Sequence, residues 1–282
     1  MNSFFDTIYT YFSYPFVVYS FVVGILIAFS SSLFGASLVL KRHSMIGDGL
    51  SHIAFGAMAV SAILDIFVND MIIVMPITIL AAILILRTGK KSKINGDATI
   101  AMLSVGSLAI GYLLMNLFPV STNISGDVCS SLFGSTEFLN LKTSDVLICS
   151  IFSISVIILF VFNYNKIFAV TFDEDFSLSC GVNSDGVNLF MAVITAVVIV
   201  LAMNLVGALL ISALIVFPPI SAMRVCKSYF STVLVSAIIS VFSAGFGIIL
   251  SMYIASPVGS TVAVVNIISF FLCYAIGKLA KK

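Results

Sequence analysis

The chain has 282 residues, of which 61% are hydrophobic and only 9% are charged, whereas soluble domains have about 25% charged residues. So few charged side chains cannot cover a water-facing surface, and the mean hydropathy of +1.22 is typical of a chain dissolved mostly in lipid. The formal net charge of +1 indicates neither a nucleic-acid-binding surface nor an acidic tail. The composition therefore predicts a polytopic membrane protein.

Long apolar runs, bounded by charged or turn-forming residues, follow one another along the chain. About 20 apolar residues cross the hydrocarbon core as a helix, and the runs lie at residues 16–40, 49–66, 70–87, 98–117, 145–163, 186–217, 229–254 and 261–279. The sixth run is too long for one crossing and somewhat short for two, and its centre contains Asn204 and Gly207. We expect an all-α transmembrane helical bundle of about eight to nine spans, in which the sixth run is one tilted helix or a broken pair.

The basic residues separate these two possibilities, because an added crossing reverses the side of everything after it. With two crossings, all Lys and Arg residues except Lys142 fall on the inner side. With one crossing, the basic residues near the C-terminus move outside, namely Arg224, Lys227, Lys278, Lys281 and Lys282. We therefore predict nine segments with the N-terminus outside, and a backbone break near residues 204–207 that is buried in protein or lines a cavity.

Asp48 and His52 lie one helical turn apart near the start of the second run, so both project from one helix face. A carboxylate within a span is costly, and it predicts a protein interior or a water-filled path. Carboxylate and imidazole together suit Zn²⁺, Mn²⁺ or Fe²⁺ better than Ca²⁺ or Mg²⁺. The spacing also fits a plain helix start, in which Asp48 caps the helix and His52 only packs. Spacing alone leaves both interpretations open.

Residues 218–228 join two long runs and combine Pro218 and Pro219 with Arg224 and Lys227. Proline stops a helix and is well tolerated in the first turn of the next one. The pattern predicts that the prolines end the preceding helix and begin a short interfacial helix anchored by its charges.

Two further charged stretches on the inner side are expected to be solvated. His43 follows Lys41 and Arg42 in the loop between the first two runs, and the acidic run at residues 173–175 lies between the fifth and sixth. Neither pattern by itself indicates a metal site.

The stretch SMIGDGLSHIAFGAMAV at residues 44–60 resembles the second span of the permease subunits of zinc and manganese ABC importers, the ABC-3 family. That family's Gly-Asp or Ala-Asp pair, followed by Ser-His and small residues, is matched by Gly47, Asp48, Ser51, His52, Gly56 and Ala57. Residues 170–183 are similar to its inner acidic segment, 205–225 to its Val-Gly-x-Leu-Leu segment, and 256–265 to the turn before its last helix. The resemblance spans residues 16–279.

The resemblance implies a type II importer-like permease, with residues 1–282 as a single transmembrane domain that forms a homodimer in the lipid of a prokaryotic cell (inner) membrane. It implies two ATPase subunits on the inner face and an external solute-binding protein that delivers the metal. Residues 218–228 become the coupling helix, through which Pro218, Pro219, Arg224 and Lys227 reach the ATPase. Asp48 and His52 of each copy become metal ligands across the twofold axis.

The expected function is ATP-driven import of a divalent transition metal, with this chain forming the pore and holding no cofactor of its own. The sequence contains no GxxxxGK[ST] motif, so ATP hydrolysis is expected of a separate subunit rather than of this chain. The motif does not separate zinc from manganese, although imidazole slightly favours zinc. The alternative is a secondary metal cation transporter driven by an ion gradient, which would need no ATPase.

Overall fold

The computed structural model describes residues 10–64, 71–91, 96–118 and 143–279, and the regular structure within them is α-helical. The helices are α2 (Pro15–Leu40), α3 (Met45–Leu64), α4 (Met71–Lys91), α5 (Gly96–Leu117), α8 (Thr143–Phe172), α9 (Glu174–Ser179), α10 (Ser184–Val206), α11 (Ala208–Val225), α12 (Tyr229–Ile254) and α13 (Val258–Leu279). Eight of these described helices are long and apolar enough to cross a membrane, and the apolar part of α4, Met71–Arg87, is shorter. The expected all-α bundle of eight to nine spans is confirmed.

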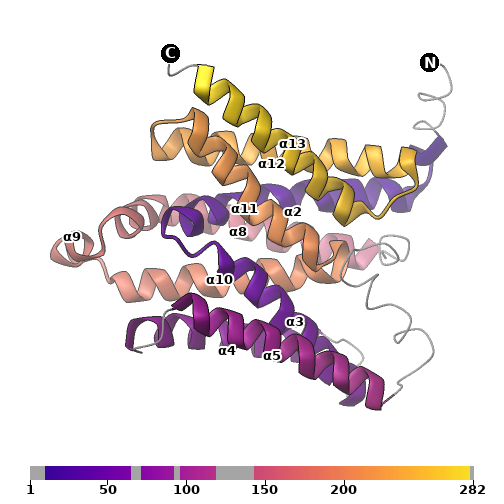
Figure 1. Ribbon diagram of the computed structural model, residues 1–282, viewed down its shortest axis with the longest axis horizontal. Coiled ribbons are helices and arrows are strands. Elements are labelled where there is room, and N and C mark those ends of the chain that lie inside the picture. Colours follow the sequence, from indigo (N-terminus) through magenta and orange to yellow (C-terminus); the bar gives the residue numbers. More distant parts are fainter. Residues whose placement is uncertain (1–9, 65–70, 92–95, 119–142, 280–282) are drawn as a thin grey trace.

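The long helices form one bundle (Figure 1). Helix α2 packs against α8, α11 and α12, whereas α3 packs against α4, α5 and α11, and α11 also packs against α13. The short helix α9 projects at the end of the bundle where α2, α11 and α13 end, on the left of Figure 1. Because basic residues favour the inner side of the membrane, we expect this end of the bundle to face the inside of the cell. Lys142, the basic residue expected on the outer side, lies outside the described residues.

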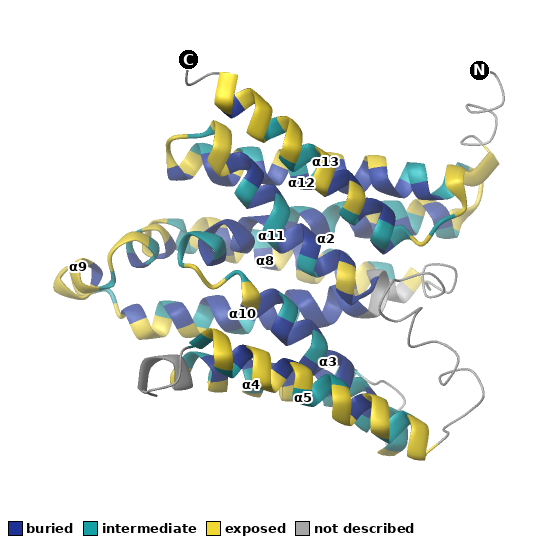
Figure 2. Ribbon diagram, viewed as in Figure 1, coloured by how far each residue is buried: buried dark blue, intermediate teal, exposed yellow. Residues whose placement is uncertain are grey.

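Burial divides the long helices into central and peripheral ones (Figure 2). In the most apolar part of α3 and of α10, 67% of the residues are buried, against 17% in α5 and 22% in α8 and α13. The peripheral helices expose large apolar side chains, such as Phe162 on α8 at 84% and Met102 on α5 at 73%. Such surfaces are stable where lipid is the solvent. Helix α3, which carries Asp48 and His52, is therefore held in the protein interior.

The sixth apolar run is a broken pair of helices, as the charge distribution predicts. Helix α10 ends at Val206 and α11 begins at Ala208, with Gly207 between them at φ 93° and ψ 153°. Residues that have a side chain rarely adopt this backbone conformation, whereas glycine adopts it readily. Gly207 is buried in protein, so the break meets the condition for irregular backbone at membrane depth. The alternative of one long tilted helix is wrong.

The prediction that Pro218 and Pro219 end a helix and begin a separate one over residues 218–228 is also wrong. Helix α11 continues through both prolines, which are buried. A proline removes the bond to the carbonyl four residues earlier, and transmembrane helices tolerate this where a neighbouring helix covers the freed group. Here the carbonyl of Ile215 lies against Gly35 of α2, at a place where a Cβ on Gly35 would overlap it.

Helix α3 approaches α5 closely because glycines face each other at the crossing. A Cβ on Gly56 would lie 2.7 Å from the carbonyl oxygen of Ser107, and a Cβ on Gly111 would lie 2.9 Å from the Cα of Gly56. Small residues of this kind let backbones touch where no hydrophobic effect drives helices together. The contact fixes α3 against α5 and so positions the face that carries Asp48 and His52.

Candidate metal centre

The turn after α2 determines how α3 enters the bundle. The N–H of His43 donates to the carbonyl of Leu38 (2.9 Å) and the N–H of Arg42 donates to that of Val39 (3.0 Å). These are the two bonds of a Schellman motif, with Arg42 at φ 61° in the position that glycine usually takes. The N–H of Ile46 then donates to the carbonyl of His43 (3.1 Å), which starts the next helix. The connection between α2 and α3 is therefore short, and the N–H groups of Lys41, Arg42, His43 and Ile46 in it are hydrogen-bonded.

Asp48 and His52 face each other from successive turns of α3. Oδ2 of Asp48 and Nε2 of His52 are 3.6 Å apart, and the two side chains are 48% and 26% exposed, respectively. This separation is longer than a hydrogen bond, so the two atoms approach each other without a direct bond. Nδ1 of His52 is buried and has no hydrogen-bond partner among the described residues. The nitrogen that faces Asp48 is Nε2, so Nε2 rather than the buried Nδ1 is placed to bind a metal together with the carboxylate.

A third residue, Ser212 of α11, completes the surroundings of Asp48. Its hydroxyl donates to Oδ1 of Asp48 at 3.1 Å. Helix α3 begins at Met45, so Asp48 lies inside the first turn rather than before it. Its place in the first turn agrees with a favourable interaction with the helix dipole, and the bond from another helix shows that Asp48 does more than begin α3. Sequence reasoning missed Ser212, since a lone serine in an apolar run carries no signal.

Asp48 and Ser212 line an open hollow of about 300 Å³ between α3, α11 and α13. Its other lining residues are mostly small or apolar, namely Ser44, Met45, Leu209, Ala213, Val216, Phe217 and Ala263. The hollow opens at the surface of the chain, so a second molecule can cover it.

A single copy of the chain does not close a metal site within its described part. No group of three or more His, Cys, Asp or Glu side chains gathers anywhere among these residues. Zn²⁺ takes about four ligands, whereas α3 supplies one carboxylate and one imidazole. The other ligands are therefore not supplied by His, Cys, Asp or Glu side chains of the described residues.

The four residues expected to contact an ATPase differ in their exposure to solvent. Pro218 and Pro219 are buried within α11, so they are not available to a partner. The guanidinium of Arg224 lies over the ring of Tyr274, 5.5 Å from its centroid, in a cation–π contact. Lys227 is exposed in the connector between α11 and α12. Of the four residues, Arg224 and Lys227 are both exposed. Arg224 lies over an aromatic ring, whereas no such contact is described for Lys227.

The acidic run at residues 173–175 is solvated at Asp173 and Asp175, as expected, but it begins helix α9 rather than forming a loop. Asp173 caps α9 by accepting a hydrogen bond of 2.9 Å from the N–H of Phe176, and Glu174 pairs with Lys41 across 2.9 Å. Phe176 is 63% exposed and Leu178 is 55% exposed. The ion pair of Glu174 could not be predicted from the sequence, because Lys41 lies 133 residues away. Helix α9 therefore presents apolar side chains beyond the inner end of the bundle.

His43 keeps an exposed position, as expected. Partial burial lowers its pKa below the ordinary value, and the charge of Lys41 lowers it as well, whereas Asp97 and Glu174 raise it. The ring is therefore neutral at neutral pH, and it is not grouped with other metal-binding side chains in the described part of the chain.

Comparison with known proteins identifies a family that matches most of the chain. The model of the ABC 3 transport family matches residues 13–277. The high-affinity zinc uptake system membrane protein ZnuB of Buchnera aphidicola is 27% identical, over 89% of this chain and 93% of that protein. The manganese transport system membrane protein MntC of Listeria monocytogenes is 24% identical, over 93% of this chain and 90% of that protein.

A solved structure has the same fold. PsaBC from Streptococcus pneumoniae, determined in complex with Fab, matches with a TM-score of 0.83 at 22% sequence identity. The match covers 95% of this chain and 94% of the solved one. At this identity the likeness establishes the helix arrangement and leaves the chemistry to be argued from the site.

Proposed function

Because the chain belongs to the ABC 3 transport family, we propose that it is the membrane-spanning permease subunit of an ABC importer for zinc or manganese. The observation that carries the proposal is the pair formed by Asp48 and His52, a carboxylate and an imidazole 3.6 Å apart on one helix face. These donors suit both metals, and relatives named for zinc and manganese uptake support the same cargo.

The pair is suited to passing an ion rather than storing it. Both side chains are partly exposed, and conduction requires binding that is weak enough to release the ion. In two copies of the chain related by a twofold axis, the open hollow beside Asp48 faces its counterpart. Two carboxylates and two imidazoles then surround one ion at the dimer interface. This homodimer is part of the proposal.

The number of bound ions tests the dimeric site. The purified complex is expected to bind one Zn²⁺ per two copies of this chain, as measured by native mass spectrometry at rising zinc concentration. Asp48→Ala is expected to remove that ion while leaving two copies in the complex. One ion per chain, or binding that survives Asp48→Ala, would contradict a shared site.

A separate ATPase subunit is proposed to dock at the inner end of the bundle. Helix α9 offers exposed Phe176 and Leu178, and Lys227 is exposed in the α11–α12 connector. These features favour α9 with Lys227 as the docking surface, in place of a helix over residues 218–228. An external solute-binding protein is proposed to deliver the metal at the opposite end.

Alanine substitutions at two exposed phenylalanines test the docking surface. Phe176→Ala is expected to weaken retention of the ATPase subunit by about tenfold, as for an interface hot spot. Phe118→Ala is the matched control, since Phe118 is 53% exposed but follows α5 at the other end of the bundle. Lys227→Glu tests the connector in the same pull-down. Equal retention in all variants would place docking elsewhere.

Metal accumulation in cells tests the function itself. Asp48→Ala and His52→Ala are each expected to lower zinc or manganese accumulation by at least about tenfold, at matched membrane levels of the protein. Asp185→Ala is the control, because it removes an exposed acid at the start of α10. Accumulation equal to that of the wild type in both α3 variants would reject the assignment.

The rival function, a secondary transporter driven by an ion gradient, differs in its energy source. The importer is expected to move metal into vesicles only when its ATPase subunit and ATP are present. Uptake by this chain alone, driven by a proton or sodium gradient, would favour the rival.

A further inference from the structure

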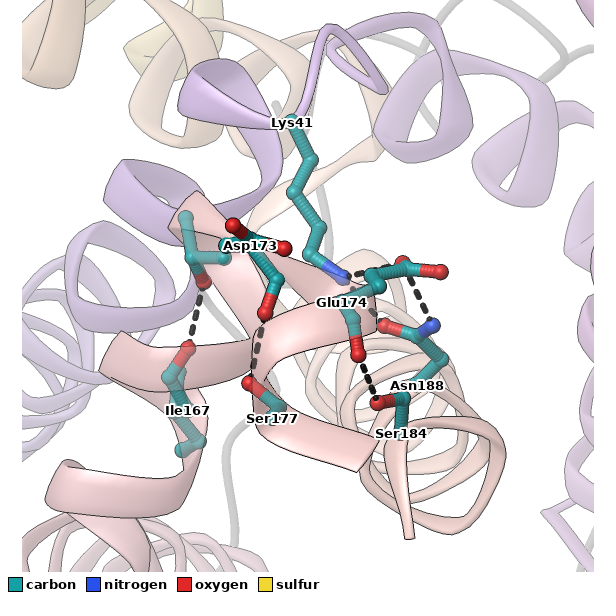
Figure 3. Close-up of polar contacts among 8 residues, drawn as sticks. Lys41, Ile167, Asp173, Glu174, Ser177, Ser184 and Asn188 are labelled. Carbon is teal, nitrogen blue, oxygen red and sulfur yellow. Dashed lines mark hydrogen bonds and ion pairs between the residues drawn. The ribbon is translucent and has the colours of Figure 1, made fainter. Parts of the chain in front are cut away.

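Lys41, in the turn after α2, belongs to a polar cluster at the inner end of the bundle (Figure 3). Its side chain is only 7% exposed, and its Nζ lies 2.9 Å from Oε1 of Glu174. Nζ also donates to Oδ1 of Asn188, and Nδ2 of Asn188 donates to the same Glu174 oxygen at 2.9 Å. We call Lys41, Glu174 and Asn188 the inner node. It joins three separate segments, the α2–α3 turn, α9 and α10.

The burial of Lys41 indicates a specific role for the inner node. Lysine is almost never buried unless its charge is paired, and Glu174 lies 133 residues away in the sequence. Between the turn and the end of α8 lies a hollow of about 280 Å³ that Lys41 and Glu174 both line. The ion pair therefore spans a region where the backbones do not pack tightly.

Helix α9 is built as a stiff unit on one side of the inner node. The carboxylate of Asp173 caps its start, and Gly181 at φ 80° ends it. The N–H of Val182 donates to the carbonyl of Ser177 at 2.9 Å, which is the longer bond of a Schellman motif. The hydroxyl of Ser184 donates to the carbonyl of Glu174 at 2.9 Å. A displacement of α9 is therefore expected to move Glu174 with it.

The turn on the other side of the inner node is equally constrained. Lys41 and Arg42 lie in the hydrogen-bonded Schellman turn that ends α2, and α3 begins at Met45. Asp48 is in the first turn of that helix. A displacement of Lys41 is thus transmitted through a few fixed residues to the metal-binding carboxylate.

We propose that the inner node couples α9 to α3, so that movement of α9 during the ATP cycle repositions Asp48 and His52. Lys41, Glu174 and Asn188 are positioning residues that act through the backbone and contact no metal. This inference rests on the proposed function, in which α9 contacts the ATPase and the α3 pair contacts the metal. Breaking the inner node separates ATP hydrolysis from metal movement without detaching the ATPase.

The test measures zinc imported per ATP hydrolysed by the complete transporter in lipid vesicles. Glu174→Gln keeps the shape of the side chain but removes its charge, and Lys41→Met keeps the apolar stem. Both variants are expected to lower the zinc-to-ATP ratio by at least about fivefold, the lower end of typical coupling between sites, while ATP hydrolysis persists. Lys41→Arg, which keeps the charge, is expected to restore most of the ratio.

Tyr229→Phe is the matched control. It removes another buried bond between segments, from the Tyr229 hydroxyl to that of Ser37 at 2.7 Å, but this bond joins α12 to α2 and does not involve α9. The zinc-to-ATP ratio of this variant is expected to equal that of the wild type. A ratio that falls as far in Tyr229→Phe as in Glu174→Gln would overturn the proposal.

Two other outcomes would also overturn it. An unchanged ratio in folded Glu174→Gln and Lys41→Met complexes means that α9 and α3 are coupled elsewhere. Loss of both activities in proportion to loss of folded complex, in both variants, means that the inner node only stabilises the fold. Asp48→Ala in the same vesicles tests the proposed function separately, because wild-type import by that variant rejects the metal site but not the node.

Discussion

The hydroxyl of Ser212 donates a 3.1 Å hydrogen bond to Oδ1 of Asp48 across 164 residues of sequence. Ser212 lies just over one turn into α11, after the break at Gly207. The other oxygen of Asp48 faces His52, so the serine binds one carboxylate oxygen and leaves the second on the side of the imidazole. The helix break and the metal-binding face of α3 are therefore parts of one arrangement.

Ser212→Ala is expected to weaken metal binding without abolishing transport. A hydrogen bond to a charged group contributes about 1.5–3 kcal/mol, and the 48% exposure of Asp48 reduces this to about 1 kcal/mol. The apparent KM for zinc import should rise about fivefold, with a smaller change in the maximal rate. Ser251→Ala, which removes a bond to Ile248 within α12, should leave KM unchanged. A KM that stays constant or falls in Ser212→Ala would contradict this role.

Gly56→Ala is expected to destabilise the bundle by forcing α3 away from α5. The added Cβ would lie 2.7 Å from a backbone oxygen of Ser107, and overpacking of this kind costs about 1–3 kcal/mol. The thermal unfolding temperature should fall by several degrees. Circular dichroism is the suitable probe, because the chain contains no tryptophan.

Gly106→Ala is the control for that experiment. Gly106 also lies in a membrane helix, α5, but no atom would lie within 4 Å of its added Cβ. Its unfolding temperature should stay the same or rise slightly, since alanine favours helix. Equal losses in the two variants would show that the α3–α5 contact is not the cause.

The orientation in the membrane predicts opposite labelling at the two ends of α12. Lys227 and Ala255 are exposed just before and just after this helix. Cysteine is introduced at either position into a chain whose five native cysteines are replaced by alanine. Because basic residues favour the inner side, a membrane-impermeant maleimide should label Ala255→Cys in intact cells and Lys227→Cys only after lysis. The reverse pattern would invert the topology.

Hydropathy and charge predict the spans well, since a segment in lipid must satisfy its own backbone hydrogen bonds and a helix does so. The length of the sixth run and the positions of Arg224 and Lys227 indicate the break that Gly207 then makes. Asp48 and His52 are recognisable because their spacing places them on one face whatever the tertiary fold. These features depend on local sequence or on the membrane.

The features that escaped prediction depend on contacts between distant segments. Pro218 and Pro219 remain inside α11 because a neighbouring helix compensates for the lost hydrogen bonding. Glu174 is bound by Lys41, although its own neighbours suggest a solvated loop. Ser212 acquires its role only where α11 crosses α3. Propensity and spacing carry no information about such crossings.

The central claim is that Asp48 and His52 bind the metal that this chain moves across the membrane. The most direct measurement is ATP-dependent ⁶⁵Zn²⁺ uptake into vesicles containing the purified complex, with wild type and Asp48→Ala compared at equal ATPase content. We expect uptake by Asp48→Ala to fall by at least about tenfold, with the ATPase subunits still bound. Uptake at the wild-type rate would contradict the claim.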